Sequence, residues 1–497
     1  MVNFRIISKI IGSLLFIEAF FMSWCAIMAI VFHEDDQVAF LMSMLVTFGF
    51  GFLFLFMGRN AQNTLSRHDA YLLVTSVWVI FSLFGMFPFL IHGSITNLTD
   101  AYFETISGFT TTGASILDDV ECLPHGILFW RSLTQWVGGL GIVFFTIAIL
   151  PSLVAGSVKV FAAEATGPIK AKMHPRLTTT AKWIWSIYLL LTIGCGVSFW
   201  AVGMNWYEAL NYSMTTTATG GFSIHNDGTN VFNSPEIDYI SILFQFLAGI
   251  NFTLLYVSIF KTRLTHLFRD SEFKLYITVV AIATMVIMST LILQMGYDYE
   301  RAFRESLYQV VSFMTTTGVY NADVAQWPHL TWIIIGCVML LGACAGSTSG
   351  GFKCIRGVML LKVVRNNFRQ SLHPNAVLPV RINGQNVPRA RLIALSAFFV
   401  LVVMMLLVTT TIMILSGIDS VNSIIIALSC VSNVGPSLAN DIGANITWSG
   451  MADHIKWVLC LLMLMGRLEI MTVLVLFTRS FWKENLLFHQ YYEILAG

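Results

Sequence analysis

Runs of about 20 apolar residues recur along the whole chain and constrain its fold more than any other feature. A helix of about that length crosses a bilayer core of about 30 Å. Hydrophobic residues make up 56% of 497 positions and charged residues 11%, less than half of the roughly 25% found in soluble domains. We expect an all-α integral membrane protein whose first run is a span and not a removable signal. Ten membrane spans are predicted, at about residues 10–32, 38–57, 71–93, 125–153, 183–203, 235–260, 272–296, 329–361, 392–417 and 454–478.

The charged residues between these runs alternate in sign. Basic segments such as 159–182 and 353–391 alternate with acidic ones such as Glu34, Asp35 and Asp36. Cytoplasmic loops of membrane proteins carry the excess of Lys and Arg, so we expect both termini to be cytoplasmic. The opposite, acidic face would concentrate cations.

Four shorter segments lie between spans three and four, five and six, seven and eight, and nine and ten. They are too polar to cross the membrane and are spaced at roughly 100 residues, a period that indicates internal repeats. We therefore expect four pseudo-symmetric repeats of helix, pore loop and helix around one pore, preceded by two helices. The segments read FETISGFTTTGAS (103–115), YEALNYSMTTTATGGFS (207–223), RESLYQVVSFMTTTGVY (304–320) and VNSIIIALSCVSNVGPS (421–437). The predicted divisions are 1–68 for the first two helices, then 69–180, 181–268, 269–388 and 389–497 for the four repeats.

Each segment ends in a tetrad with a glycine, preceded by a hydroxyl residue. Backbone carbonyls replace the water shell of K⁺ where the chain takes up dihedral angles that glycine permits. Non-helical backbone at membrane depth must be buried or line a wet cavity, so four such loops most economically surround one axis. Chance explains two or three Thr-x-Gly triplets, but not four at matching places between spans. The predicted potassium-binding filter is Thr110, Thr111, Thr112 and Gly113; Thr217, Ala218, Thr219 and Gly220; Thr315, Thr316, Thr317 and Gly318; and Ser432, Asn433, Val434 and Gly435.

Acidic residues lie near the starts of three of the short helices: Asp100, Glu208 and Glu305. An acidic group suits the positive end of a helix dipole. N-terminal capping alone explains all three.

The tetrads and their placement resemble the Trk-type potassium transporter membrane subunits of the Trk/Ktr/HKT superfamily, over nearly the full chain. The resemblance implies a pore related to potassium channels, in which a glycine at the position of Gly113 goes with potassium preference and serine marks sodium-favouring plant relatives. Ala218, Asn433 and Pro436 depart from the channel pattern, so we expect an imperfectly fourfold filter. The resemblance also implies potassium uptake across a prokaryotic inner membrane, a homodimer embedded in membrane lipids, and a separate cytosolic nucleotide-binding regulatory subunit.

The eighth predicted span contains GACAGSTSGGFKCIR (342–356), a poor helix former. Gly342, Gly346 and Gly350 suit a small-residue packing face, whereas the hydroxyl residues suit an unwound segment in a water-filled cavity. A phosphate loop is excluded because no Gly-Lys-Ser/Thr follows. The resemblance implies a gate loop in the third repeat that obstructs the pore beneath the filter. The gate residues are then Gly346, Ser347, Thr348, Ser349, Gly350 and Gly351.

Arg467 lies inside the tenth span. An arginine there costs about 2.5–3.5 kcal/mol on insertion scales and needs a partner or water. Glu469 is one candidate partner in a structural ion pair. The resemblance instead places Arg467 in the pore, facing the gate loop, where its charge would slow cations. Asn251 suits either a cavity wall or helix packing.

Gated uptake is driven by the membrane potential, which supplies about 2.3 kcal/mol per charge per 100 mV. The sequence also bears on several competing functions. Symport with Na⁺ or H⁺ needs buried carboxylates, and the spans offer only Glu18 and Glu469. No span carries the repeated arginines of a voltage sensor, and no G-x-S-x-G or H-E-x-x-H motif indicates an enzyme. The net charge of +1 gives no reason to expect a nucleic-acid partner, and the eight scattered cysteines indicate no zinc site. Potassium is the only cofactor expected.

Overall fold

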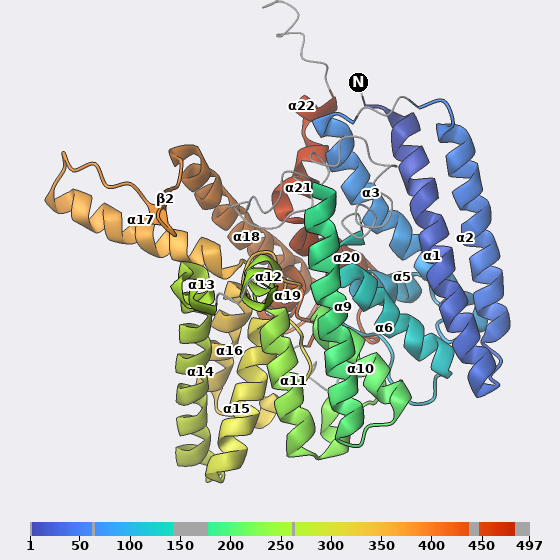
Figure 1. Cartoon of the computed structure of the whole chain (residues 1–497), viewed down its shortest axis with the longest axis horizontal. Coiled ribbons are helices and arrows are strands. Elements are labelled where there is room, and N and C mark those ends of the chain that lie inside the picture. The colour runs from blue at the N-terminus through green and yellow to red at the C-terminus, as the bar shows by residue number, and fades with distance from the viewer. Residues whose placement is uncertain (1, 62–64, 143–176, 261–263, 437–446, 483–497) are drawn as a thin grey trace, which may run out of the picture.

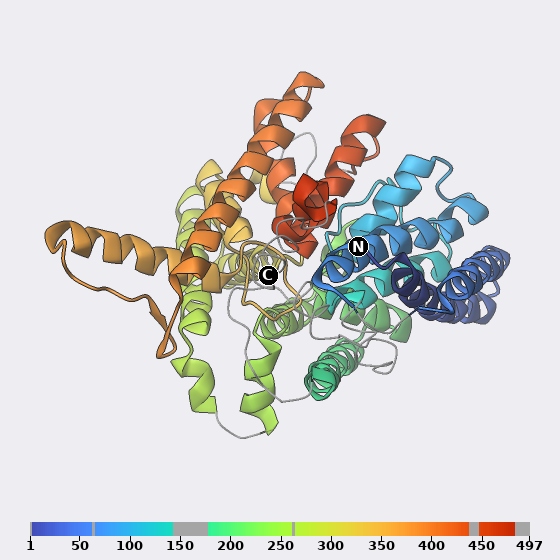
Figure 2. The ribbon, with the colours of Figure 1, turned by 90° about the horizontal axis from the view of Figure 1, so that it is seen from above.

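The computed structural model describes residues 2–61, 65–142, 177–260, 264–436 and 447–482. This part of the chain is mainly helical, and its only strands form a short antiparallel hairpin, β1 (Arg381–Ile382) with β2 (Gln385–Asn386). The longest helices are α1 (Phe4–Phe32), α2 (Gln37–Gly58), α3 (Arg67–Gly85), α9 (Leu177–Ala201), α14 (Ser271–Met295), α17 (Cys354–Leu372) and α18 (Arg389–Leu415). Figure 1 shows α1, α2 and α3 together on one side of the molecule and α14 on the other, whereas α17 projects away from the bundle in both Figure 1 and Figure 2.

Within the described residues, six helices are long and apolar enough to cross a membrane, and eight if each of two bent helix pairs counts as one span. The structure is therefore that of a multi-pass helical membrane protein, and the number of ten spans stays a prediction. Most of the second half of the predicted span 125–153, and most of the basic segment 159–182, lie outside the described residues.

Four short helices match the four predicted pore loops, and we call them the pore helices. They are α5 (Leu98–Phe109), α10 (Trp206–Ala218), α15 (Tyr299–Met314) and α19 (Ser420–Ser432). Polar residues precede each one, and Glu208 completes a capping box with Asn205, as the sequence predicts. Asp100 lies in the first turn of α5 but also pairs with Lys456 at 2.5 Å. Capping is wrong for Glu305, which lies beyond the first turn of α15 and pairs with Arg301 at 2.6 Å.

Two of the helices that follow the pore helices are sharply bent, one at residues 249–251 and the other at Glu469, which has a φ of 65°. α11 (Pro235–Ala248) and α12 (Phe252–Phe260) meet at 103°, and α20 (Asp453–Leu468) and α21 (Ile470–Leu474) belong to a pair bent by 114°. α6 (His125–Gly139) ends at paired glycines, and residues 342–353 separate α16 (His329–Leu341) from α17. The remaining elements are α4 (Phe87–His92), η1 (Gly228–Phe232), α13 (Leu264–Arg269), η2 (Val324–Gln326), η3 (Val475–Phe477) and α22 (Arg479–Trp482).

The first two helices are fastened to the first repeat at the N-terminus of α6. Pro124 precedes α6 and offers no side-chain cap. Two carboxylates from the connection between α1 and α2 cap the helix instead. Glu34 accepts a hydrogen bond from the N–H of His125 at 2.6 Å, and Asp36 accepts one from the N–H of Ile127 at 3.1 Å. Negative groups suit a helix N-terminus, where several N–H groups lack partners.

Candidate functional site

The four pore helices end in the same backbone geometry. In each, the chain first passes through a left-handed residue and two positions later through a glycine with positive φ. A left-handed conformation is uncommon for residues other than glycine and indicates a constrained site. The left-handed residues are Thr111, Thr219, Thr316 and Asn433, with φ of 54°, 53°, 57° and 56°. The glycines are Gly113, Gly221, Gly318 and Gly435, with φ of 81°, 80°, 75° and 95°.

When the four loops are aligned by this backbone geometry, the second loop is shifted by one residue from its position in the sequence alignment. Gly221, and not Gly220, matches Gly113, and Ala218, and not Thr217, matches Thr110. The hydrogen bonds agree, because one residue of each loop donates its N–H to the carbonyl five positions earlier. These bonds are Thr112 to Ser107, Gly220 to Thr215, Thr317 to Ser312 and Val434 to Ser429, at 2.9, 2.9, 2.8 and 3.0 Å. The hydroxyl of Thr217 instead bonds that of Thr192 on α9 at 2.9 Å.

The four loops close into a ring. A Cβ added to the glycine of one loop would overlap a carbonyl oxygen of the next loop. Each loop therefore contacts its neighbour so closely that a side chain does not fit, and the contacts return to the first loop. The overlaps join Gly113 to the carbonyl of Gly220, Gly221 to that of Thr317, Gly318 to that of Val434, and Gly435 to that of Thr112. We call these eight residues the carbonyl ring.

The fourth loop breaks the symmetry of the ring. Its left-handed residue is Asn433, where the other loops have threonine. The Asn433 amide donates to the hydroxyl of Thr112 and to the carbonyl of Met463, each at 2.9 Å. This side chain therefore links the fourth loop to the first.

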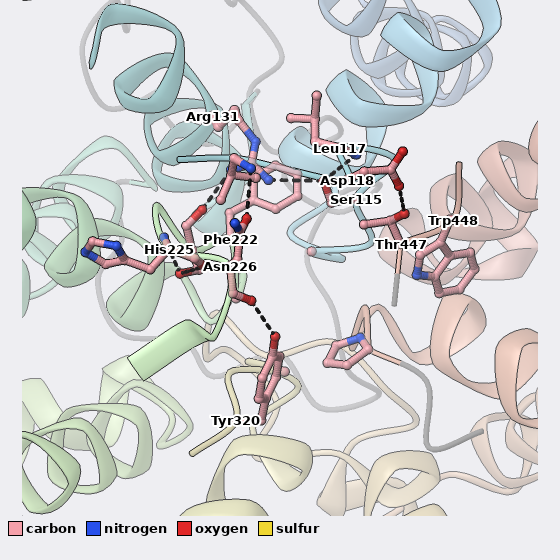
Figure 3. A pocket seen from close by; sticks show the side chains of 16 residues that line it. Ser115, Leu117, Asp118, Arg131, Phe222, His225, Asn226, Tyr320, Thr447 and Trp448 are labelled. Carbon is pink, nitrogen blue, oxygen red and sulfur yellow. Dashed lines mark hydrogen bonds between the residues drawn. The ribbon is translucent and has the colours of Figure 1, made fainter. Parts of the chain in front are cut away.

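A cavity of about 120 Å³ lies against one side of the ring, lined by residues from all four loops and by Asp118, Arg131 and Tyr320 among others (Figure 3). Asp118 accepts a hydrogen bond from Ser449 at 2.7 Å, and Tyr320 donates to the carbonyl of Asn226 at 3.1 Å. Beside the cavity, the Asn226 amide and the N–H of Glu121 hold the pKa of the Asp119 carboxyl below its usual range. Acidic groups at this mouth favour cations.

A buried ion pair braces the first two loops behind this cavity. Arg131 on α6 and Glu104 on α5 pair at 2.9 Å, with side chains 2% and 0% exposed. The guanidinium also donates to the carbonyl of Ser223 at 2.8 Å, and Glu104 accepts from the N–H of Ile116 at 3.0 Å. This pair was not predicted, because no sequence motif marks it; the available sequence signal is an arginine inside an apolar span.

Replacing Glu104 with leucine is expected to destabilise the protein by about 3–5 kcal/mol, because it leaves a buried arginine without its partner. Thermal unfolding in detergent would show a lower melting temperature. The double variant Glu104→Leu with Arg131→Leu is expected to recover much of the loss, since apolar replacement of both partners is often nearly neutral. Glu300→Ala is the control, because Glu300 pairs with Arg304 while 52% exposed and should cost less than about 1 kcal/mol. A wild-type melting temperature for Glu104→Leu would contradict the bracing role.

Residues 342–353, which we call the gate segment, pack against the third loop at its left-handed residue, Thr316. The N–H of Gly350 donates to the hydroxyl of Thr316 at 2.6 Å. At its ends, Asn251 donates to the carbonyl of Ala345 at 2.6 Å, while Glu272 accepts from the N–H of the same residue at 2.6 Å and of Ile355 at 3.0 Å. The segment is not helical, so the helix-packing interpretation of its glycines is wrong.

Arg467 joins the gate segment to the first repeat. Its guanidinium donates to the carbonyl of Thr348 at 2.8 Å and to those of Gly138 and Gly139 at 2.7 Å. Glu469 pairs with Arg356 at 2.5 Å. One side chain of α20 thus bridges the gate segment and the end of α6.

The apolar helices and the ring define a multi-pass membrane transport protein. The family model TrkH, described as a cation transport protein, matches residues 36–485, so the chain belongs to the TrkH family of cation transport proteins. It is 35% identical to the Trk system potassium uptake proteins TrkH of Halomonas elongata and Escherichia coli K12, over 97% of this chain and 100% of each relative. The crystal structure of the potassium transporter TrkH from Vibrio parahaemolyticus matches with a TM-score of 0.87 at 33% identity, over 97% of this chain and 100% of that one. These relatives are transporters, which agrees with the expectation that the chain is not an enzyme.

Proposed function

We propose that this chain takes up potassium across the inner membrane of a prokaryote through a channel-like pore whose selectivity filter is the carbonyl ring. The observation that carries the proposal is the closed contact of four loops, each with a positive-φ glycine against the next loop's carbonyl. Carbonyl oxygens gathered around one axis can replace the hydration shell of K⁺. The names of the relatives, Trk system potassium uptake proteins, support the same ion.

The potassium sites comprise the predicted tetrads with the second loop moved by one residue, so that Gly221 joins them. Four pseudo-symmetric repeats within ten spans, with both termini cytoplasmic, fit this pore. Two carboxylates at and beside the outer cavity, Asp118 and Asp119, support the orientation, because the basic segments then face the cytoplasm.

Flow through the pore is gated by residues Gly346 to Gly351 together with Arg467. The direct contact of this segment with Thr316 of the third loop, and its contact with Arg467, support this role. The pore subunit works as a homodimer with a cytosolic Trk-type nucleotide-binding regulatory subunit. The relatives' name, Trk system, supports only the presence of a further component.

A second candidate function is symport of K⁺ with Na⁺ or H⁺. Glu18 favours it, because this carboxyl is 1% exposed and neither of its oxygens has a hydrogen-bond partner among the described residues. Such a group inside a membrane is a functional candidate by default. If uptake by Glu18→Gln keeps the wild-type dependence on external Na⁺ and pH, gated uptake without coupling is the better description.

Rubidium uptake by cells that lack their own potassium systems tests the filter. Gly113→Ser is expected to lower the ratio of rubidium to sodium uptake about tenfold, a change of about 1.4 kcal/mol, because the serine Cβ would displace a carbonyl of the ring. Gly93→Ser is the matched control, since Gly93 has φ of 84° and nothing within 4 Å of an added Cβ. An unchanged ratio for Gly113→Ser would refute the filter assignment.

A further inference from the structure

Gly220 is the one residue at its position in the carbonyl ring that has no side chain. The matching residues are Thr112, Thr317 and Val434. Gly220 is not among the residues with positive φ, so its backbone conformation is open to any residue. The requirement for glycine at this position must come from a neighbour.

That neighbour is Gln135 on α6, whose side chain is fully buried. A Cβ on Gly220 would overlap the Gln135 amide group, so Gln135 occupies the space that a side chain fills in the other three loops. The amide Nε2 donates to the carbonyl of Gly220 at 2.6 Å, and Oε1 accepts from the N–H of Phe222 at 3.0 Å. One side chain therefore grips the second loop on both sides of Gly221.

These two hydrogen bonds restrict the backbone of the second loop, where Gly220 and Gly221 are adjacent. Two successive glycines leave the backbone free to rotate, and rotation of the Gly220 peptide would take its carbonyl out of the ring. A carbonyl oxygen has two lone pairs, so the bond from Gln135 can fix its direction and still leave it able to contact an ion. Loss of one coordinating carbonyl changes both the size of the site and the number of carbonyl dipoles, the two properties to which preference for K⁺ over Na⁺ is attributed.

We infer that Gln135 is a specificity-determining residue, which replaces the missing side chain of the second loop and holds the Gly220 carbonyl in the ring. It is a positioning residue, since it acts on the ion through Gly220. The inference rests on the proposed potassium filter.

A size-swap experiment tests this role through the ratio of rubidium to sodium uptake. Gln135→Ala alone is expected to lower the ratio about tenfold, because the loop loses both bonds. Gly220→Val alone is expected to lower it as well, because the new side chain displaces the amide. The double variant Gln135→Ala with Gly220→Val is expected to restore the ratio to within about twofold of wild type. Valine is chosen over threonine because the hydroxyls of Thr112 and Thr317 bond Thr110 and Thr315, whereas the second loop has Ala218 there.

Gln245 provides the matched control. It lies four residues before Gly249, as Gln135 lies four before Gly139, and it is equally buried. No hydrogen bond joins it to the carbonyl ring in the described part of the chain. Gln245→Ala should leave the ratio unchanged, whatever it does to protein amount, since a ratio measured in the same cells does not depend on how much protein they hold.

Two outcomes would overturn the inference: a wild-type ratio for Gln135→Ala, or a double variant no more selective than the single variants. If Gln135→Ala does not fold, the double variant alone decides. Gly113→Ser separates the two proposals. If Gly113→Ser shifts the ratio while Gln135→Ala does not, the positioning role of Gln135 is refuted and the filter assignment is kept. If neither variant shifts the ratio, the filter assignment itself is refuted.

Discussion

Gly221→Ala is expected to reduce potassium uptake about a hundredfold. Alanine at φ of 80° costs about 1–2 kcal/mol, and its Cβ would overlap the backbone carbonyl of Thr317, at a further cost of about 1–3 kcal/mol for overpacking. About 2.7 kcal/mol corresponds to a hundredfold. Rubidium uptake at equal amounts of protein in the membrane is the measurement.

Two controls make this result specific. Gly203→Ala carries the same backbone strain, with φ of 106°, but has nothing within 4 Å of the new Cβ, so uptake should stay near wild type. Gly220→Ala displaces the side-chain amide of Gln135 and not a backbone carbonyl, so it should reduce uptake by at most about tenfold. If Gly220→Ala were the more damaging change, the sequence alignment of the second loop would be right and the structural one wrong.

The membrane character of the chain and the positions of the four pore helices could be predicted from the sequence, because apolar length and repeated glycines are local signals. The register of the second loop could not. Its sequence, Ala218-Thr219-Gly220-Gly221, places two glycines side by side, and the Thr-x-Gly pattern alone does not decide which of them takes positive φ. The decision comes from the neighbouring loop, since only Gly221 lies against the carbonyl of Thr317.

The side-chain contacts that support the ring, those of Gln135 and Arg131, could not be predicted for a related reason. Gln135 and Gly220 are 85 positions apart in the chain, and Arg131 and Ser223 are 92 apart. Neither contact leaves a periodic pattern, so only the fold brings these residues together. A charged or amide side chain in an apolar span is the available signal, and it applies to Arg131 and Gln135 as it did to Arg467.

The role of Arg467 itself divides into two physical effects that one pair of variants separates. As a fixed charge, the guanidinium would repel cations passing below the ring, and any cationic side chain would serve. As a latch, it holds the carbonyls of Thr348, Gly138 and Gly139 together, and only the planar fork of arginine fits three acceptors. Hydrogen bonds from a charged group contribute about 1.5–3 kcal/mol each.

Arg467→Ala is therefore expected to raise rubidium uptake at least about tenfold, because losing even one of the three bonds, about 1.5 kcal/mol or more, corresponds to slightly more than tenfold. Arg467→Lys keeps the charge but not the fork, and we expect it to raise uptake by several-fold, because the bridge between the gate segment and the break after α6 is the stronger of the two effects. Uptake by Arg467→Lys at the wild-type level, beside a raised rate for Arg467→Ala, would show that charge alone forms the barrier. If neither variant raises uptake at normal amounts of protein, Arg467 has a structural role and the gate must open without releasing it.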